Sequence, residues 1–348
     1  MRNTLIHKSD IPKFSENALT AKEFLRKGPG KVLLVEGKND ERFFSRCIEK
    51  YDTSKQLKIH TLEGYPNKYK RYDKLEKKGR QFYLGNHGCV YVKEAIIIII
   101  KKRFLDEKNC LEQLQQKFYG IVDKDFDDDN VSIQQYGIEK ETKLKDIDII
   151  KERRIISTDS NDIETMSFMF DKKTVENICK NYFSETTYLN DLYFAITCAC
   201  KLGYIRKENS LHNLGLSFKT VFPEGQPIKY EKYIQNEDIN LKQILIDIPR
   251  GNKSAIDLLK LPTDFHNKEW IYCRGHDLMG ILACYYVLKK SDTDNFGVVH
   301  CDKTGPGQRS DVIRRVEDKM CDEIICNTEL DEYKDSKVYS FLMYIIMQ

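Results

Sequence analysis

The chain has 348 residues, of which 41% are hydrophobic and 32% charged, a globular composition that excludes a disordered chain or a coiled coil. The 57 Lys and Arg residues nearly balance the 54 Asp and Glu residues, so the net charge of +3 is too small to indicate nucleic-acid binding by itself. The apolar runs, among them residues 95–100 and 281–288, are all far shorter than a membrane-spanning helix. The first ten residues lack the apolar region of a signal peptide, and eleven scattered cysteines are typical of reduced thiols. We therefore expect a cytoplasmic protein without membrane contact.

Buried strands and amphipathic helices alternate along the first half of the chain. A short helical lead-in is expected over 1–30, followed by a strand at KVLLVEG (31–37) and a helix over 39–50. The isoleucine-rich run 92–108 favours a crossover helix, with a strand as the alternative. Further elements are expected as strands at 57–64, 118–126 and 153–158, and as a helix over 161–183. This order predicts an α/β domain over 31–170, with a parallel sheet flanked by helices, and a mostly helical region over 171–348.

The cysteines and glycines do not form the usual zinc or nucleotide motifs. The nearest approach to paired metal ligands is Cys198-x-Cys200, which lies in an apolar stretch and is interpreted as two buried core thiols. Neither GPGK (28–31) nor RGNKS (250–254) has the spacing of a phosphate-binding loop. The sequence therefore predicts no ATP hydrolysis by this chain.

Acidic residues stand where the chain leaves the predicted strands, and the carboxyl ends of parallel strands meet at one edge of a sheet. Carboxylates gathered there repel one another unless a cation such as Mg²⁺ or Mn²⁺ neutralises them. Two residues have a structural alternative, because Asp40 could cap the next helix and Glu164 could form a capping box with Asn161. The predicted metal ligands are Glu36, Asp40, Asp123, Asp125 and Glu164.

Two of these segments resemble a known superfamily. VLLVEGKND (32–40) and GIVDKDFD (120–127) are similar to the two signature motifs of the Toprim domain, a glutamate after the first strand and a DxD after the third. The resemblance covers about residues 31–170 and implies a Toprim-like catalytic domain. It implies that Glu36 is the essential glutamate and that Asp123 and Asp125 bind metal.

A narrower resemblance involves two further segments. STDSNDIETM (157–166) and CRGHDLMGIL (273–282) are similar to a bacterial Toprim-like family known for the nuclease effector of the PARIS anti-phage system. That resemblance implies a toxic effector that cleaves tRNA and is controlled by an ABC-type ATPase partner. It also implies that Glu164 is a further ligand.

Among Toprim chemistries, hydrolysis needs the fewest additional parts. The length leaves little room for a topoisomerase gate, and the zinc module usual in such primases is absent from the sequence. We expect a Mg²⁺-dependent (or Mn²⁺-dependent) endonuclease, with two ions that activate water and stabilise the leaving oxygen. Lys124 and Arg274 are candidates for offsetting charge in the transition state. His276 is a candidate acid or base, with a structural role beside a helix-capping Asp277 as the alternative.

A basic segment with interleaved aromatic residues is the candidate nucleic-acid surface. Residues 68–83 contain seven Lys and Arg residues and four aromatic ones, which suit phosphates and unpaired bases, and a solvated charged helix is the alternative. The residues predicted to bind nucleic acid are Lys68, Lys70, Arg71, Lys74 and Arg80.

The leading hypothesis is therefore an RNA-cleaving, and specifically tRNA-cleaving, effector in anti-phage defence. The alternatives are a DNA nuclease of the overcoming-lysogenisation-defect type and a Toprim module that binds or regulates without turnover. The apolar end of the chain, KVYSFLMYIIMQ, predicts core packing or a subunit interface, so a homodimer is possible.

Overall fold

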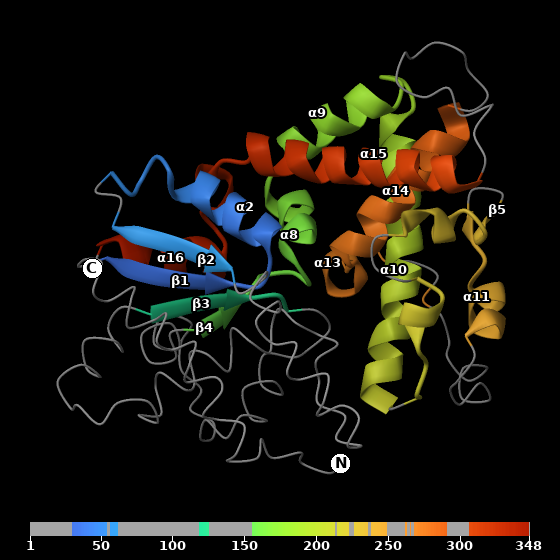
Figure 1. Ribbon diagram of the computed structural model, residues 1–348, viewed down its shortest axis with the longest axis horizontal. Helices are drawn as coiled ribbons and strands as arrows, with labels where there is room; N and C mark the ends of the chain where they lie inside the picture. Colours follow the sequence, from blue (N-terminus) through green and yellow to red (C-terminus); the bar gives the residue numbers. More distant parts are fainter. Residues whose placement is uncertain are drawn as a thin grey trace. The chain divides into compact units, whose positions relative to one another are not determined.

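The computed structural model divides the chain into two units, which are described separately (Figure 1). Unit 1 contains residues up to Asp159 and the final segment Glu329–Gln348, and unit 2 contains Ser160–Thr328. The first unit leaves off at Asp159 and not at the expected residue 170, and it also includes the last 20 residues of the chain. The residues that the structure describes are 30–53, 56–61, 118–124, 155–212, 214–222, 226–235, 238–248, 262, 265, 268–290 and 306–347.

Unit 1 contains a four-stranded parallel sheet, which confirms the predicted α/β architecture. Its strands are β1 (Lys31–Val35), β2 (Leu57–Thr61), β3 (Phe118–Val122) and β4 (Ile155–Ser157), in the order β2-β1-β3-β4. In β1, Val32–Val35 are all buried, as expected for a strand covered on both faces. Leu34 of β1 pairs with Gly120 of β3, and Val122 of β3 pairs with Ser157 of β4, so the carboxyl ends of these three strands are neighbours.

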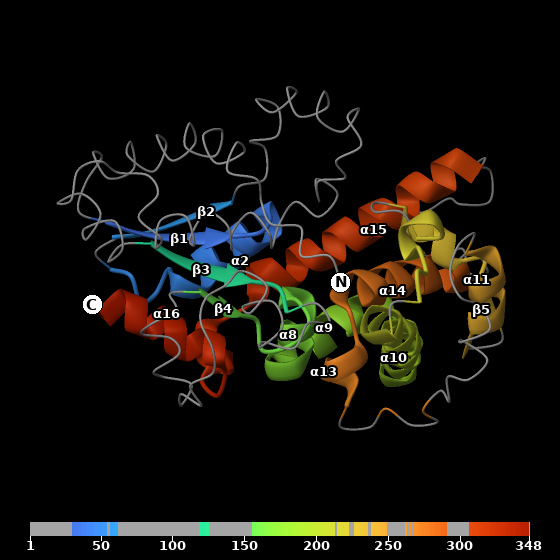
Figure 2. The same ribbon diagram turned by 90° about the horizontal axis from the view of Figure 1, so that it is seen from below.

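Two helices, α2 and α16, pack against this sheet (Figures 1 and 2). Helix α2 (Lys38–Ile48) follows β1 and buries Phe43, Phe44, Cys47 and Ile48, the apolar face expected from their spacing. The 3₁₀ turn η6 (Leu330–Tyr333) and helix α16 (Lys337–Met347) come from the end of the chain. Phe341 of α16 meets Tyr119 of β3 edge-on, with ring centroids 5.9 Å apart. The apolar chain end therefore belongs to the core of unit 1, the first of the two roles expected for it.

Unit 2 is built mainly from helices, as expected for the second half of the chain. Short elements connect them, namely η3 (Phe218–Thr220), η4 (Pro227–Tyr230) and the antiparallel pair β5 (Ile234–Gln235) and β6 (Asp238–Ile239). The helices are α8 (Ile163–Phe170), α9 (Lys172–Tyr182), α10 (Tyr188–His212), α11 (Leu241–Asp247), α13 (Glu269–Tyr272), α14 (Gly275–Lys290) and α15 (Pro306–Asn327). Within the WIYC segment (270–273), the first three residues belong to the short helix α13.

Helix α14 is the central helix of unit 2. Every residue from Asp277 to Val287 is buried, and α10, α15, α8 and η4 all contact the helix. A helix buried on all sides needs apolar residues around its whole circumference, which explains the unbroken LMGILACYYVL sequence. Cys198 and Cys200 of α10 are buried in the same core, which confirms their interpretation as core thiols. Within the described residues, none of the helices has both the length and the apolar character needed to span a membrane.

Candidate functional site

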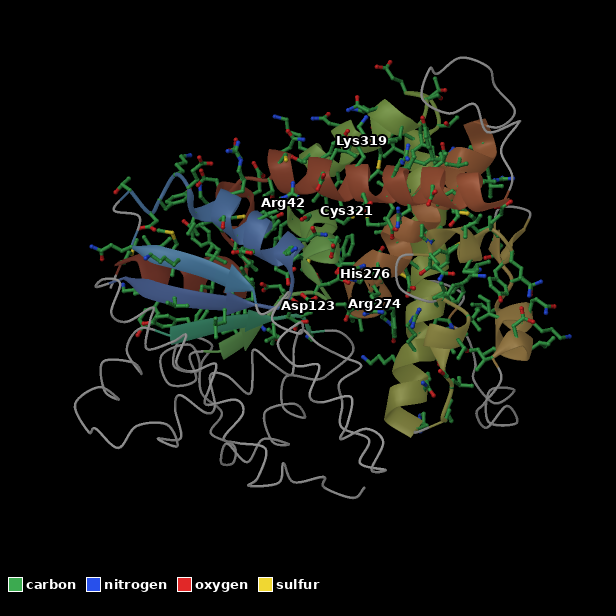
Figure 3. All side chains as sticks on the ribbon, viewed as in Figure 1. Arg42, Asp123, Arg274, His276, Lys319 and Cys321 are labelled. Atoms are coloured by element: carbon green, nitrogen blue, oxygen red, sulfur yellow. The ribbon has the colours of Figure 1, made fainter. Side chains whose placement is uncertain are left out.

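The carboxyl ends of β1 and β3 bring two of the predicted site residues together in unit 1. Glu36 follows β1 directly, and its Oε1 accepts a hydrogen bond from the backbone N–H of Asp123 at 2.8 Å. Both residues are half-buried. The pairing arises because β1 and β3 are adjacent and parallel, so two segments 87 residues apart in sequence end at the same edge. Figure 3 labels Asp123 at this end of the sheet.

The next strand end extends the same edge of unit 1. The backbone N–H of Lys124 donates to Thr158 Oγ1 at 3.1 Å, and Thr158 itself is fully buried after β4. Asp159 has a structural role, because its two carboxylate oxygens accept the backbone N–H groups of Lys337 and Val338 at the start of α16. The three strand ends are thus connected by side-chain hydrogen bonds to backbone.

Asp40 is used as a helix cap, which was the alternative to its predicted metal role. Its Oδ2 accepts the backbone N–H of Gly37 at 2.8 Å, at the start of α2. A carboxylate held there also interacts favourably with the positive end of the helix dipole. The ligand role of Asp40 stays a prediction.

The donors at this edge have the chemistry that a hard divalent cation requires, since Glu36 and Asp123 offer carboxylate oxygens from adjacent strand ends. Within the described residues, no three His, Cys, Asp or Glu side chains are arranged as a metal site. Asp125, the third expected donor, lies outside those residues. So do Lys68, Lys70, Arg71, Lys74 and Arg80 of the candidate nucleic-acid segment and the isoleucine-rich run 92–108.

The other predicted residues, Glu164, Arg274 and His276, belong to unit 2. There Asp162, only 2% exposed, is the N-cap of α8, and its Oδ1 accepts the backbone N–H of Thr165 at 2.9 Å. The capping box expected between Asn161 and Glu164 is therefore wrong by one residue. Asn161 instead donates its side-chain amide to the backbone oxygen of Cys273 at 2.6 Å.

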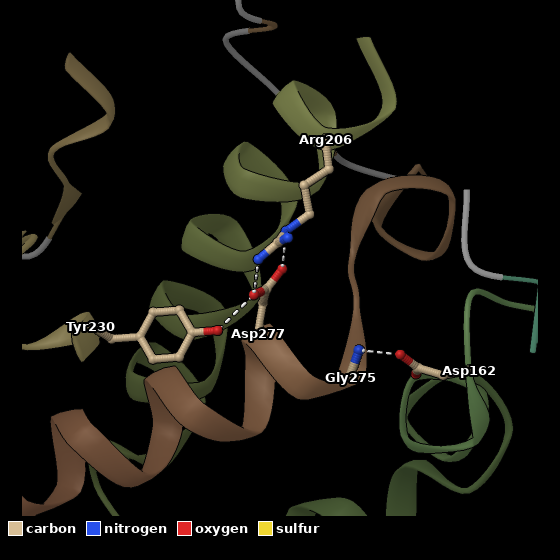
Figure 4. A network of polar contacts seen from close by, with 5 residues as sticks. All are labelled: Asp162, Arg206, Tyr230, Gly275 and Asp277. Carbon is tan, nitrogen blue, oxygen red and sulfur yellow. Dashed lines mark hydrogen bonds and ion pairs between the residues drawn. The ribbon is translucent and has the colours of Figure 1, made fainter. Parts of the chain in front are cut away.

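Asp162 also reaches the start of α14. Its Oδ2 accepts the backbone N–H of Gly275 at 2.6 Å (Figure 4). A side chain at position 275 would not fit, because a Cβ there would lie 2.5 Å from Asp162 Oδ1 and 2.5 Å from the Cβ of Glu164. Gly275 is thus required by the close approach of α8 to α14.

A buried ionic network lies two residues further along α14 (Figure 4). Asp277, only 1% exposed, accepts two hydrogen bonds from the Arg206 guanidinium, each 2.9 Å long, and one from the Tyr230 hydroxyl at 2.6 Å. The structural alternative for His276 required Asp277 to cap its own helix. Asp277 pairs instead with Arg206 of α10. Arg206 and Tyr230 could not be predicted from the sequence, because a single basic or aromatic residue in a helical region carries no local signal.

His276 lies between these two anchored residues (Figure 3) and is exposed. Partial desolvation would lower the pKa of its imidazole, and Arg274 acts in the same direction. The negative charge of Glu164, assisted by Asp162 and Glu317, outweighs both, so the pKa of His276 is raised. His276 is therefore more readily protonated than an isolated histidine.

The surroundings of two acidic residues near His276 raise the pKa values of their carboxyl groups. Burial raises the pKa of Asp162 to about 6, and the charge of Glu164 acts in the same direction. Burial likewise raises the pKa of Glu317 on α15 to about 7, with Asp318 and Glu164 contributing repulsion. Both groups ionise in unit 2 at a higher pH than they would in an unfolded chain.

These shifts predict how unit 2 responds to pH. Because Glu317 holds its proton in the folded state up to about pH 7 and releases it near pH 4.3 when unfolded, its ionisation weakens folding as pH rises through that interval. We expect a Glu317→Gln variant to gain stability relative to wild type between about pH 5 and pH 8. Urea unfolding followed by the fluorescence of Trp270, the only tryptophan, measures this. The exposed Glu185→Gln variant is the control, and an equal response of both variants would contradict the assignment.

No protein-family model, curated protein or solved structure matches this chain.

Proposed function

We propose that unit 1 is a Toprim-like catalytic domain and that the protein is a metal-dependent endonuclease whose substrate is RNA, specifically tRNA. The observation that carries this proposal is the contact between Glu36 and the backbone of Asp123 at adjacent ends of parallel strands. Two carboxylates gathered at the ligand-binding edge of a sheet are costly without a cation. A structural role alone would not require both of them there.

The residues of this edge have separable roles in the proposed reaction. Mg²⁺ bound there would activate water and offset the charge that develops on the phosphoryl oxygens. Glu36 and Asp123, with Asp125, would hold it through carboxylate oxygens. The hydrogen bond from the Asp123 amide orients the Glu36 carboxylate before substrate arrives, so that less ordering is needed during the reaction.

The direct test is cleavage by the purified protein of total tRNA and of plasmid DNA, offered separately with Mg²⁺ and with EDTA. We expect discrete tRNA fragments with Mg²⁺ only. Replacing Glu36 by glutamine keeps the size of the side chain and removes its charge, and should reduce cleavage on the order of 10²–10³-fold, the loss typical of removing one electrostatic group from a catalytic site.

The matched control is Glu49→Gln, an exposed carboxylate at the far end of α2 whose partner is Arg46. It should leave cleavage unchanged. Thermal unfolding followed by circular dichroism would verify that both variants fold. Full activity of the Glu36→Gln variant would refute the catalytic assignment.

The remaining outcomes identify the alternatives. Plasmid cutting that depends on Glu36 would keep the site and change the substrate to DNA. Binding of tRNA without any cleavage would favour a Toprim module that binds without turnover. Regulation by an ABC-type ATPase partner is part of the proposal, and addition of such a partner should suppress the cleavage.

A further inference from the structure

The last helix of unit 1 begins at the edge of the sheet where the candidate site lies. Helix α16 starts at Lys337 and contacts β4, the strand next to β3 (Figure 2). Asp159 fixes this start, because its carboxylate accepts the backbone N–H groups of Lys337 and Val338. Buried apolar side chains such as Phe341 hold the rest of the helix. These contacts anchor α16 without using the side chain of Lys337.

The side chain of Lys337 extends to the carboxyl end of β4. It is half-buried, and its Nζ donates to Oγ of Ser157, the last residue of that strand, at 3.1 Å. Ser157 pairs with Val122 of β3, and Asp123 is the next residue of the chain. Neighbouring strands lie about 5 Å apart, so the ammonium group is anchored about one strand spacing from the end of β3 and about two from the end of β1, which Glu36 follows.

A purely structural role does not explain a lysine at this position. The N-terminus of a helix has a partial positive charge, so a cation in the first turn is repelled by the helix dipole. Lys337 is the first residue of α16, and ordering its long side chain against Ser157 also costs conformational entropy. An uncharged polar side chain would make the same hydrogen bond without the repulsion. The positive charge therefore requires a reason other than the fold.

We propose that Lys337 is a substrate-contacting residue of unit 1, and that its ammonium group binds a backbone phosphate of a nucleic acid lying across the strand ends. This inference rests on the proposed nuclease function, which places the cleaved phosphate beside Glu36 and Asp123. Lysine binds phosphate as a point charge, and it is charged throughout the neutral pH range. A divalent cation held by Glu36 and Asp123 would offset their charge, and the Asp159 carboxylate is engaged by two backbone N–H groups.

The test is binding of tRNA, and separately of a DNA duplex, by the Glu36→Gln protein, in which cleavage does not interfere. Replacing Lys337 by methionine in this background keeps the length of the side chain and removes its charge, while the backbone bond to Asp159 stays. We expect tRNA binding to weaken about tenfold, the loss of one charge-assisted hydrogen bond. The slope of log affinity against log salt should fall by about 0.7 to 0.9, the contribution of one phosphate contact.

Two further variants separate this contact from a general effect of charge or fold. Lys334→Met is the matched control, because Lys334 is a largely exposed lysine of the same terminal segment that pairs with Asp331. It should leave the affinity and the salt slope unchanged. Lys337→Arg keeps the positive charge and should keep the salt slope of the parent protein. Hydrogen exchange of the β3 and β4 amides verifies that unit 1 is intact in each variant.

The outcomes separate this inference from the proposed function. Unchanged affinity and salt slope in the Lys337→Met variant would overturn the inference, even where wild-type protein cleaves tRNA in a Glu36-dependent manner. A reduced slope in a protein that does not cleave would support Lys337 and refute the nuclease. The same losses with the DNA duplex alone would support the contact and change the substrate to DNA.

Three other results would count against Lys337. Equal losses for Lys337→Met and Lys334→Met would mean that any lysine of the segment serves. Equal losses for Lys337→Met and Lys337→Arg would mean that the effect does not come from the charge. Absence of binding to both nucleic acids would overturn the inference as well, since there would be no phosphate for Lys337 to contact.

Discussion

Replacing Asp277 by alanine should destabilise unit 2 by about 3–5 kcal/mol, the usual effect of removing one partner from a buried ion pair. The loss comes less from the bonds themselves than from Arg206, whose guanidinium stays inside the unit without its carboxylate partner. The Tyr230 hydroxyl also loses its acceptor in a buried position. Urea unfolding followed by Trp270 fluorescence, which reports on unit 2, measures the effect.

A matched substitution on the same unit defines the baseline. Asp311 of α15 is largely exposed and pairs loosely with Arg314 at 3.8 Å, so Asp311→Ala should change the free energy of unfolding by less than about 1 kcal/mol. Similar effects of the two substitutions would mean that the Asp277 network contributes no more than a surface pair.

The same network predicts acid sensitivity. Burial by itself would raise the pKa of Asp277, but the positive charges of Arg206 and Arg274 and the hydrogen bonds from Tyr230 and Arg206 together outweigh it, and the pKa is lowered. A carboxyl group whose pKa is lowered by folding stabilises the fold at any pH above its pKa in the unfolded chain, which is near 3.9. This stabilisation is lost as the pH falls through the pKa of the folded state. The wild-type advantage over Asp277→Ala should therefore shrink below about pH 4.

Replacing Phe341 by alanine should destabilise unit 1 by about 3–5 kcal/mol, as expected for a large aromatic side chain removed from a core. Phe341 is fully buried, and its ring meets Tyr119 of β3 edge-on. The substitution leaves a cavity beside the central strands although it lies seven residues from the end of the chain. Hydrogen exchange of the β1 and β3 amides, measured by mass spectrometry, reports on unit 1 directly.

Met347 at the end of the same helix provides the control, because it is 77% exposed. Met347→Ala should leave exchange in β1 and β3 unchanged. Unchanged exchange in the Phe341→Ala variant as well would show that α16 is dispensable for the sheet, and would contradict the assignment of the chain end to unit 1.

The sequence by itself determined the sheet and the edge at which Glu36 and Asp123 lie. The uninterrupted apolar run before Glu36 requires a strand buried on both faces, and a strand of that kind belongs in a parallel sheet. Parallel strands end at a common edge, so the expectation that Glu36 and Asp123 meet needed only local patterns and one topological rule. Their hydrogen bond agrees with that expectation.

The tertiary structure alone decided which polar residues are buried and with what partners. Asp162 and Gly275 are 113 residues apart, and Arg206 and Asp277 are 71 apart. In sequence these residues look like ordinary polar residues of helix ends and surfaces. The spacing of apolar residues predicts which face of a helix is buried, but it does not indicate which distant residue a polar side chain contacts. The neighbouring residues Asn161 and Asp162 illustrate this difference between local pattern and tertiary partner.

Asn161 and Asp162 are both good N-cap residues, and local preference does not separate them. The distant backbone oxygen of Cys273 engages Asn161, and the cap of α8 falls to Asp162. The same reasoning applies to α16, whose apolar sequence indicates burial without naming the sheet that it covers. Local chemistry determined what each segment can form, whereas contacts between distant segments decided which of those possibilities is used, because their free energy depends on neighbours that no local pattern contains.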